Sequence, residues 1–192
     1  LSDTHIGESV NAEQMNHLNS YNFDIFNKRL WGWATQLLNL INYRRNIAPV
    51  DNLIVPMLGD MISGDIHDEL AKSNVANCME QMIRGASLIS QAKNQTNISF
   101  DIPKSFINVF SVYDHDILLM HGDVISGGGS SVSISNAVSR MRGVLQYRKN
   151  LITEVGDAIG VDGAMNFDSV MIGHFHRIDE IDIGTGELHI CG

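Results

Sequence analysis

The sequence predicts an α/β fold, because apolar segments with strand-like and helix-like spacing alternate along its 192 residues. Hydrophobic residues make up 44% of the chain, which is enough to build a buried core in one domain. The sequence contains no internal repeat and no linker long enough to divide it. We therefore expect a single domain over residues 1–192.

Three helices are predicted from apolar residues that recur at intervals of three and four. The first is marked by Phe23, Phe26, Leu30, Trp33, Leu37 and Ile41. The second is expected from His67 to Ser90, with an apolar face made by Met79, Met82, Ile83, Ala86 and Ile89. The third is expected to follow Ser135 as its N-cap and to carry Val138, Met141, Leu145, Ile152, Val155 and Ile159.

The strands are predicted from short apolar runs and from alternation of apolar and polar residues. They cover residues 53–58, 98–102, 107–112, 117–120 and 168–172. Residues 114–116 predict a turn, and a hairpin is expected to join residues 178–183 to 187–190 around Gly184-Thr185-Gly186. Pro56 counts against a central place for the first strand, because proline has no N–H to donate.

The charge and the cysteine count restrict the class of protein. Thirteen basic residues against 22 acidic ones give a net charge of -9, so the surface as a whole does not suit a polyanion. A phosphate-bearing substrate would need a local positive site, which bound cations supply. No apolar run approaches the roughly 18 residues of a membrane span, and two cysteines are too few for a disulfide framework. We expect a cytoplasmic protein.

Four short motifs lie at or just past apolar runs: Asp3-Thr4-His5, Gly59-Asp60, His121-Gly122-Asp123 and Gly173-His174-Phe175-His176. The candidate metal ligands in them are Asp3, His5, Asp60, His121, His174 and His176. Imidazole nitrogen combined with carboxylate oxygen suits divalent Mn, Fe or Zn. Six ligands are too many for one tetrahedral Zn, but are about right for two metals that share a bridging carboxylate.

The content and order of these motifs resemble the calcineurin-like metallophosphoesterase superfamily, and the likeness extends from Asp3 to His176. The resemblance implies two packed mixed β-sheets flanked by helices, a four-layer α/β/β/α sandwich with metals at the strand ends. It implies that Asp60 bridges the two metals. The first metal would also have Asp3, His5 and His176 as ligands, and the second His121 and His174. It implies two divalent ions, Mn²⁺ first, with Fe, Zn, Ni or Co as alternatives.

The implied activity is hydrolysis of a phosphate ester by a hydroxide that bridges the two metals and attacks phosphorus. The first helix and the last two motifs look most like the nuclease and small phosphodiesterase branch, whose members are often bacterial or phage-encoded. The expected substrate is therefore a nucleic acid or a nucleotide. Two alternatives stay open: a phosphomonoesterase such as a protein phosphatase, and a catalytically impaired relative that serves as a binding scaffold.

One motif of the superfamily is missing, so no catalytic residue is assigned. A Gly-Asn-His segment would be expected between Asp60 and His121, with its Asn on the second metal and its His beside the leaving oxygen. Either the motif is lost and the second metal site is weakened, or a segment near residues 91–98 is absent from the sequence. We favour the second, because the helix ending near Ser90 meets a polar stretch without a strand, and both ends of the chain look cropped.

Two further residues are candidates for contact with substrate. Arg177 directly follows His176 and could bind a phosphate through two N–H groups. His67, between Asp65 and Asp68, could also face substrate, although acidic residues there equally fit the exposed start of a helix.

Overall fold

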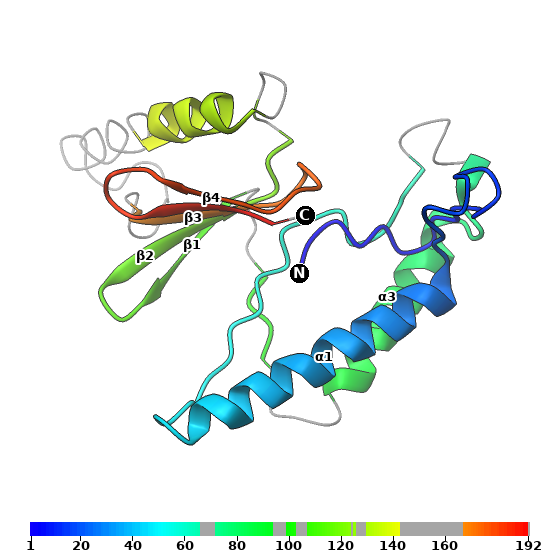
Figure 1. Cartoon of the computed structure of the whole chain (residues 1–192), viewed down its shortest axis with the longest axis horizontal. Coiled ribbons are helices and arrows are strands. Elements are labelled where there is room, and N and C mark those ends of the chain that lie inside the picture. Colours follow the sequence, from blue (N-terminus) through cyan, green and yellow to red (C-terminus); the bar gives the residue numbers. More distant parts are fainter. Residues whose placement is uncertain are drawn as a thin grey trace, which may run out of the picture. The chain divides into compact units, whose positions relative to one another are not determined.

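The computed structural model has two compact units, which are shown in Figure 1. One consists of Leu1–Asp3 and Asp101–Gly192, and the other of Thr4–Phe100. The residues that the structure describes are 1–65, 72–93, 99–102, 107–123, 125, 130–142 and 167–191. They show an α/β protein with three helical segments of at least 12 residues and one mixed sheet.

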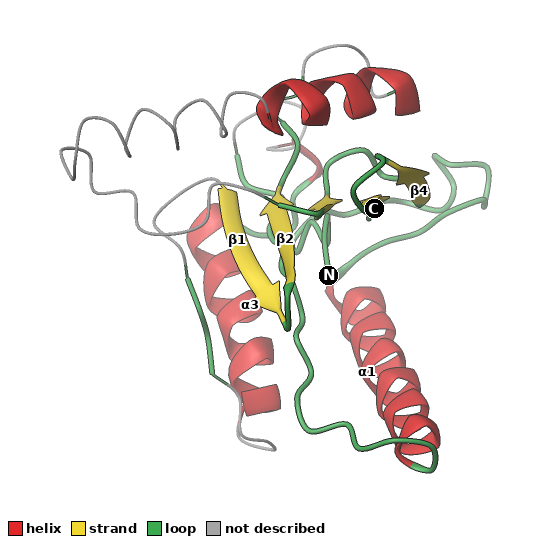
Figure 2. Ribbon diagram, turned by 90° about the vertical axis from the view of Figure 1, so that its left-hand side faces the viewer, coloured by secondary structure: helices red, strands yellow, loops and turns green. Residues whose placement is uncertain are grey.

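The first unit is built on a five-stranded sheet in the order β1-β2-β3-β5-β4. Figure 2 shows β1 beside β2 in this sheet. Its strands are β1 (Ile107–Val112), β2 (His115–Met120), β3 (Ser169–Ile172), β4 (Asp179–Asp182) and β5 (Glu187–Ile190). Strands β2, β3 and β5 are parallel, while β1 and β4 pair antiparallel at the two edges. The expected strands of this region and its hairpin are confirmed. The β1–β2 turn is shorter than predicted, because β2 begins at His115.

The core of this unit lies between the central strands and a helix over residues 131–142. Its buried members are Leu118, Met120, Ile134, Val138, Phe167, Val170, Ile172, Leu188 and Ile190. Burial of each such side chain contributes about 1.5–3 kcal/mol to folding. Because the central strands are parallel and covered, their apolar runs are nearly continuous.

The N-cap of this helix lies five residues before the predicted one. The Ser130 hydroxyl accepts the N–H of Ser133 at 3.2 Å, so Ser130 is the cap and the prediction of Ser135 was wrong. Serine at either position suits an N-cap, so only the hydrogen bond to a backbone N–H in the first turn shows which of the two serines is the cap. Of the apolar positions expected on this helix, Leu145, Ile152, Val155 and Ile159 lie outside the described residues.

The second unit contains the helices α1 (Phe23–Arg45) and α3 (Cys78–Lys93). The side chain of Asn22 caps α1 by accepting the N–H of Ile25 at 2.9 Å, and Arg44 and Arg45 lie in its last turn, where the helix dipole favours cations. Helix α1 confirms the predicted period. The exception is Trp33, which is 42% exposed, because Ala34 takes the covered position between Leu30 and Leu37.

The predicted helix over residues 67–90 was too long, and its buried face was wrong. Residues 74–77 are not helical, and residues 66–71 lie outside the described part of the chain. Gln81 and Gly85 are the buried positions of α3, whereas Met79, Met82 and Ile83 are 51–65% exposed.

Gln81 is fully buried because both ends of its amide are hydrogen-bonded. Its Oε1 accepts the N–H of Gly64 at 2.9 Å, and its Nε2 donates to the carbonyl of Ala76 at 2.9 Å. Its side chain also fills the space beside Gly7, where a Cβ would lie 2.4 Å from the Gln81 Cγ. The side chain of Gln81 thus joins the loop after Asp60 to α3 through a hydrogen bond.

Two predicted strands of the second unit are absent. Residues 53–58 form no strand, and only Leu58 among them is buried. Residues 99–102 are exposed and form no strand, and Ile98 lies outside the described residues. Proline cannot donate to a ladder, which disfavours a strand around Pro56. In the described residues the five paired strands form one sheet, so the second predicted sheet is not seen.

A membrane-spanning helix was not expected, and none of the described helices is long and apolar enough to cross a bilayer.

Candidate metal centre

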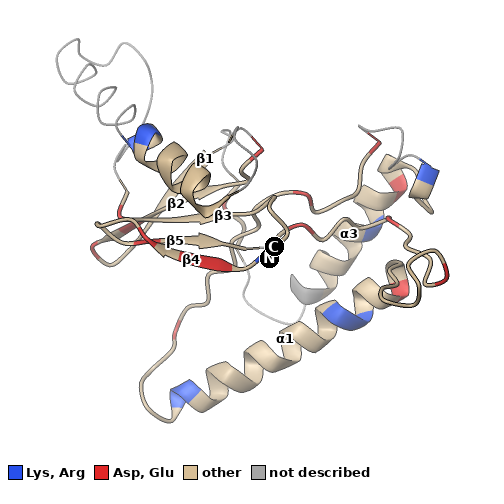
Figure 3. Cartoon of the chain, turned by 45° about the horizontal axis from the view of Figure 1, so that its top comes forward, with Lys and Arg blue, Asp and Glu red and all other residues tan. Residues whose placement is uncertain are grey.

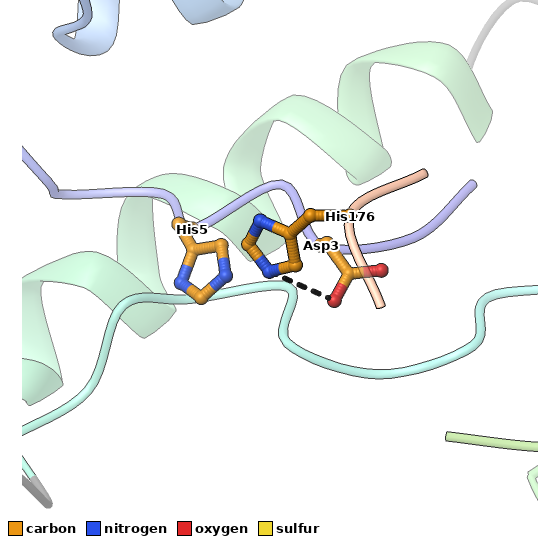
Figure 4. Close-up of side chains that lie close together, drawn as sticks. All are labelled: Asp3, His5 and His176. Carbon is orange, nitrogen blue, oxygen red and sulfur yellow. Dashed lines mark ion pairs between the residues drawn. The ribbon is translucent and has the colours of Figure 1, made fainter. Parts of the chain in front are cut away.

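In the first unit, Asp3 is a buried carboxylate held by the loop that follows β3. Its side chain is 2% exposed, and its two oxygens accept the backbone N–H of His174 at 3.0 and 3.1 Å. The hydroxyl of Ser2 also donates to Asp3. The Nε2 atom of His176 lies 3.5 Å from the Oδ1 of Asp3, as the dashed line in Figure 4 marks. Residues 171 positions apart are thus joined in one cluster.

His121 and His174 leave the same edge of the sheet. His121 directly follows β2, and His174 lies two residues past the end of β3. These strands are parallel neighbours with Met120 opposite Ile172, so their carboxyl ends coincide. The two imidazole rings lie 5.0 Å apart, nearly perpendicular to each other. The expected position of both histidines at strand ends is confirmed.

The second unit brings His5 and Asp60 together. The N–H of His5 donates to the carbonyl of Asp60 at 2.9 Å, and Ile6 forms a parallel bridge with Ile62. This pairing places the His5 Nε2 atom 3.9 Å from the Asp60 Oδ2 atom. His5 and Asp60 thus lie at the start of short paired segments rather than at the ends of full strands.

The donor atoms within each unit fit a divalent ion. Bonds of about 2.0–2.2 Å to imidazole nitrogen or carboxylate oxygen put two ligands of one ion roughly 3–4 Å apart. The distances of 3.5 Å between Asp3 and His176 and 3.9 Å between His5 and Asp60 lie in that range. Both exceed the usual length of a hydrogen bond, about 2.7–3.2 Å. Nitrogen and oxygen donors in this mixture suit Mn, Fe or Zn.

Backbone strain marks the same residues. Left-handed φ angles occur at Asp3 (+50°), His5 (+42°), Asp60 (+45°), His174 (+74°) and His176 (+48°). These make up five of the eight non-glycine residues with positive φ in the described parts of the chain. The left-handed region costs a non-glycine residue roughly 1–2 kcal/mol, and such strain gathers at functional sites. The sequence gives no sign of it, because the residues are not glycines.

Tyr21 supports the segment that carries His5, and sequence reasoning missed it. Its hydroxyl donates to the carbonyl of Thr4, and its backbone pairs with Val10. Burial is the main reason why the pKa of Tyr21 is raised to about 12. Nothing in the spacing of the sequence singles out this tyrosine, because its partner is a backbone carbonyl 17 positions away.

The raised pKa of Tyr21 predicts a loss of stability at high pH. The phenol titrates near 10 in an unfolded chain and near 12 in the fold, so the folded state holds the proton more tightly. The titration of Tyr21 should therefore leave the free energy of unfolding constant below pH 10 and should lower it between pH 10 and 12. Tyr21→Phe should remove this slope and lower stability at pH 7 by about 0.5–1.5 kcal/mol, the value of one hydrogen bond.

Urea unfolding at pH 7, 10 and 11.5 checks this expectation, with Tyr43→Phe as the control because Tyr43 is 64% exposed on α1. An equal alkaline slope in the native protein and in Tyr21→Phe would contradict it.

Of the candidate substrate residues, one is described. Arg177 donates from Nη2 to the hydroxyl of Ser131 at 3.1 Å and lies 3.6 Å from Asp179 Oδ2. Its contact with substrate stays a prediction. His67 lies outside the described residues.

A second polar cluster occupies the opposite ends of the strands. His115 Nε2 lies 2.8 Å from the Ser169 hydroxyl, and His115 Nδ1 lies 3.6 Å from Asp168 Oδ2. His115 and Ser169 border a shallow cavity of about 490 Å³ that is otherwise lined by the β4–β5 hairpin. Acidic side chains lie along β4 (Figure 3). Since β2 spans six residues of about 3.3 Å each, this cluster is remote from His121.

Comparisons with known proteins add little. No family model matches the chain, and no curated protein matches it. One solved structure, a single mutant of Vps29 from Entamoeba histolytica, is similar at 16% sequence identity with a TM-score of 0.28. The similarity covers 50% of this chain and 41% of that chain, so it spans less than half of the Vps29 structure. A likeness this weak carries no argument about function.

Proposed function

We propose that the protein is a metal-dependent phosphoesterase with a centre for two divalent cations. The observation that carries the proposal is the buried Asp3 carboxylate, which the His174 backbone holds and His176 flanks at 3.5 Å. A carboxylate this buried needs compensating charge or hydrogen bonds. A cation shared with His176 would supply the positive charge, and it would explain why the loop after β3 keeps a strained backbone.

The ligands divide into two groups under this proposal. By the motif resemblance, Asp3, His5 and His176 would be ligands of one ion, and His121 and His174 would be ligands of the other. In addition, the motif resemblance makes Asp60 a bridge between the two. Manganese is the first choice because the donors mix oxygen with nitrogen.

The chemistry of phosphate-ester hydrolysis assigns different tasks to the cations and to the chain. When bound, two cations supply Lewis-acid activation of water and neutralise phosphoryl charge. The chain fixes the ligand directions: the His174 N–H orients Asp3, and the pairing of residues 4–6 with 60–63 orients His5 and Asp60. The protein has a net charge of -9, so without cations the carboxylates of the centre would repel a phosphate.

The substrate we propose is a phosphodiester, as in a nucleic acid or nucleotide, and the protein is expected to hydrolyse it. A binding scaffold is the second candidate, and the specific observation that favours it is the missing Asn-His pair between Asp60 and His121.

Metal content and hydrolysis, measured together, test the proposal. Protein dialysed against Mn²⁺ should retain two ions per chain by elemental analysis, and should hydrolyse bis(p-nitrophenyl) phosphate until EDTA is added. Two ions without hydrolysis of either this diester or p-nitrophenyl phosphate would favour the scaffold. No retained ion at saturating Mn²⁺ would overturn the metal centre itself. Faster hydrolysis of the monoester would replace the phosphodiesterase with a phosphomonoesterase.

A further inference from the structure

Arg177 occupies a distinctive place in the loop between β3 and β4. It follows His176, whose imidazole lies beside Asp3, and one residue separates it from β4. Adjacent Cα atoms are about 3.8 Å apart, so the Cα of Arg177 lies next to that of the candidate ligand His176. A side chain of this length can reach a group bound at the neighbouring histidine.

One edge of the Arg177 guanidinium is fixed by two partners. Its Nη2 donates to Ser131 Oγ at 3.1 Å and lies 3.6 Å from Asp179 Oδ2. The Ser131 hydroxyl donates in turn to Asp179 Oδ2 at 2.6 Å, which closes a triangle of three side chains. The hydrogen bond from Ser131 is the main reason why the pKa of Asp179 is lowered, with Arg177 as a weaker cause. Asp179 therefore stays anionic at neutral pH.

A further donor of the guanidinium, Nε, lies on the same edge as Nη2. Nε of Arg177 is buried and has no hydrogen-bond partner among the described residues. A buried N–H without a partner is unfavourable, so it marks a place for an acceptor. Arg142 also has a buried Nε without a partner among the described residues. Its Nη2 donates to the carbonyls of Phe167 and Asp168, and its guanidinium stacks on the Phe167 ring, so Arg142 supports the fold of this unit.

We propose that Arg177 binds a non-bridging oxygen of the substrate phosphate, and that Ser131 and Asp179 position it and set a preference for diesters over monoesters. This inference rests on the proposed phosphoesterase function. The preference follows from charge: Asp179 offsets the positive charge of Arg177, so the pair suits a phosphodiester with one negative charge. A monoester dianion would gain less from Arg177, since Asp179 repels its second charge.

Hydrolysis of a diester and a monoester by matched variants tests this inference. With Mn²⁺ bound, Arg177→Gln should lower kcat/KM for bis(p-nitrophenyl) phosphate about 10- to 100-fold, mainly through KM. Arg177→Lys should recover part of the loss, because it keeps the charge without the planar fork. Asp179→Asn should raise the ratio of p-nitrophenyl phosphate to diester hydrolysis about threefold or more. Arg140→Gln is the control, since Arg140 is exposed on the helix over residues 131–142.

Thermal unfolding of the same variants separates substrate binding from a purely structural role. If Arg177→Gln only loosens the helix at Ser131, the Tm falls while the ratio of the two substrates stays constant, and the inference is overturned. Unchanged kcat/KM within twofold in Arg177→Gln would also overturn it.

Failure of the proposed function is recognised separately, because the native protein would then hydrolyse neither ester. Binding of inorganic phosphate, followed by calorimetry, would still decide the role of Arg177. Binding to the native protein that weakens at least tenfold in Arg177→Gln but not in Arg140→Gln supports it. Equal binding, or none to the native protein, overturns it.

Discussion

Asp3→Asn is expected to abolish metal-dependent hydrolysis while leaving the fold intact. Asparagine has nearly the shape of aspartate, and its carbonyl can still accept the His174 N–H that now reaches both oxygens at 3.0 and 3.1 Å. It lacks the negative charge that a divalent ion requires next to His176. Loss of an outer partner of a metal site commonly weakens the metal about 10- to 100-fold, so loss of a ligand should weaken it further.

Calorimetric titration with Mn²⁺ measures this effect, and circular dichroism checks the fold. Asp123→Asn is the matched control, because Asp123 is an exposed carboxylate two residues past His121 that is not among the candidate ligands. Native-like Mn²⁺ affinity in Asp3→Asn would remove Asp3 from the metal centre and would leave its burial unexplained.

Gly122→Ala is expected to have the largest effect on stability. An added Cβ would lie 2.6 Å from Ile172 Cγ2 and 3.2 Å from both the Gly173 carbonyl oxygen and the Phe175 ring, in the core under the histidine loop. The φ angle of +110° is also one that alanine rarely adopts. Overpacking and backbone strain together should lower the free energy of unfolding by about 2–5 kcal/mol.

Urea unfolding of Gly122→Ala beside Gly184→Ala separates the two causes. Gly184 also has a positive φ, +83°, but an added Cβ there would meet nothing within 4 Å. Gly184→Ala should therefore lose only the backbone term of about 1–2 kcal/mol. If the two variants lose equal stability, the clash with Ile172 does not exist.

The sheet of the first unit could be predicted because residues 107–112, 117–120 and 168–172 are short apolar or alternating runs, and because residues 184–186 have the composition of a hairpin turn. The apolar runs before His121 and His174 predict from the sequence alone that both histidines lie at strand ends. Helix α1 could be predicted from its period alone, since Phe26, Leu30 and Leu37 recur on one side. In these regions the local pattern and the tertiary packing agree.

Other features could not be predicted because they depend on partners far away in the sequence. Gln81 is buried only because Gly64 and Ala76 satisfy its amide. Residues 53–58 have the composition of a buried strand, but the structure assigns no strand there. An apolar run predicts burial only where something else supplies the covering surface.

The candidate site divides in the same way. The residue types and order of the six ligands are evident from the motifs, and the contacts of Asp3 with His174 and His176 agree with them. The supporting contacts of Tyr21, Ser131 and Asp179 carry no sequence signal, because serine, tyrosine and aspartate are common and their roles arise from position alone.

The left-handed backbone at five candidate ligands lowers the stability of this protein at the residues whose side chains would bind metal. Aspartate, asparagine and histidine enter that region more readily than other side chains do, yet glycine would occupy it with less strain. Replacing these residues by glycine would therefore relax the chain and, in the same step, remove its carboxylates and imidazoles. These five residues thus lower the stability of the fold while they keep the side chains that the proposed metal centre requires. Such an exchange of stability for activity is expected at a functional site.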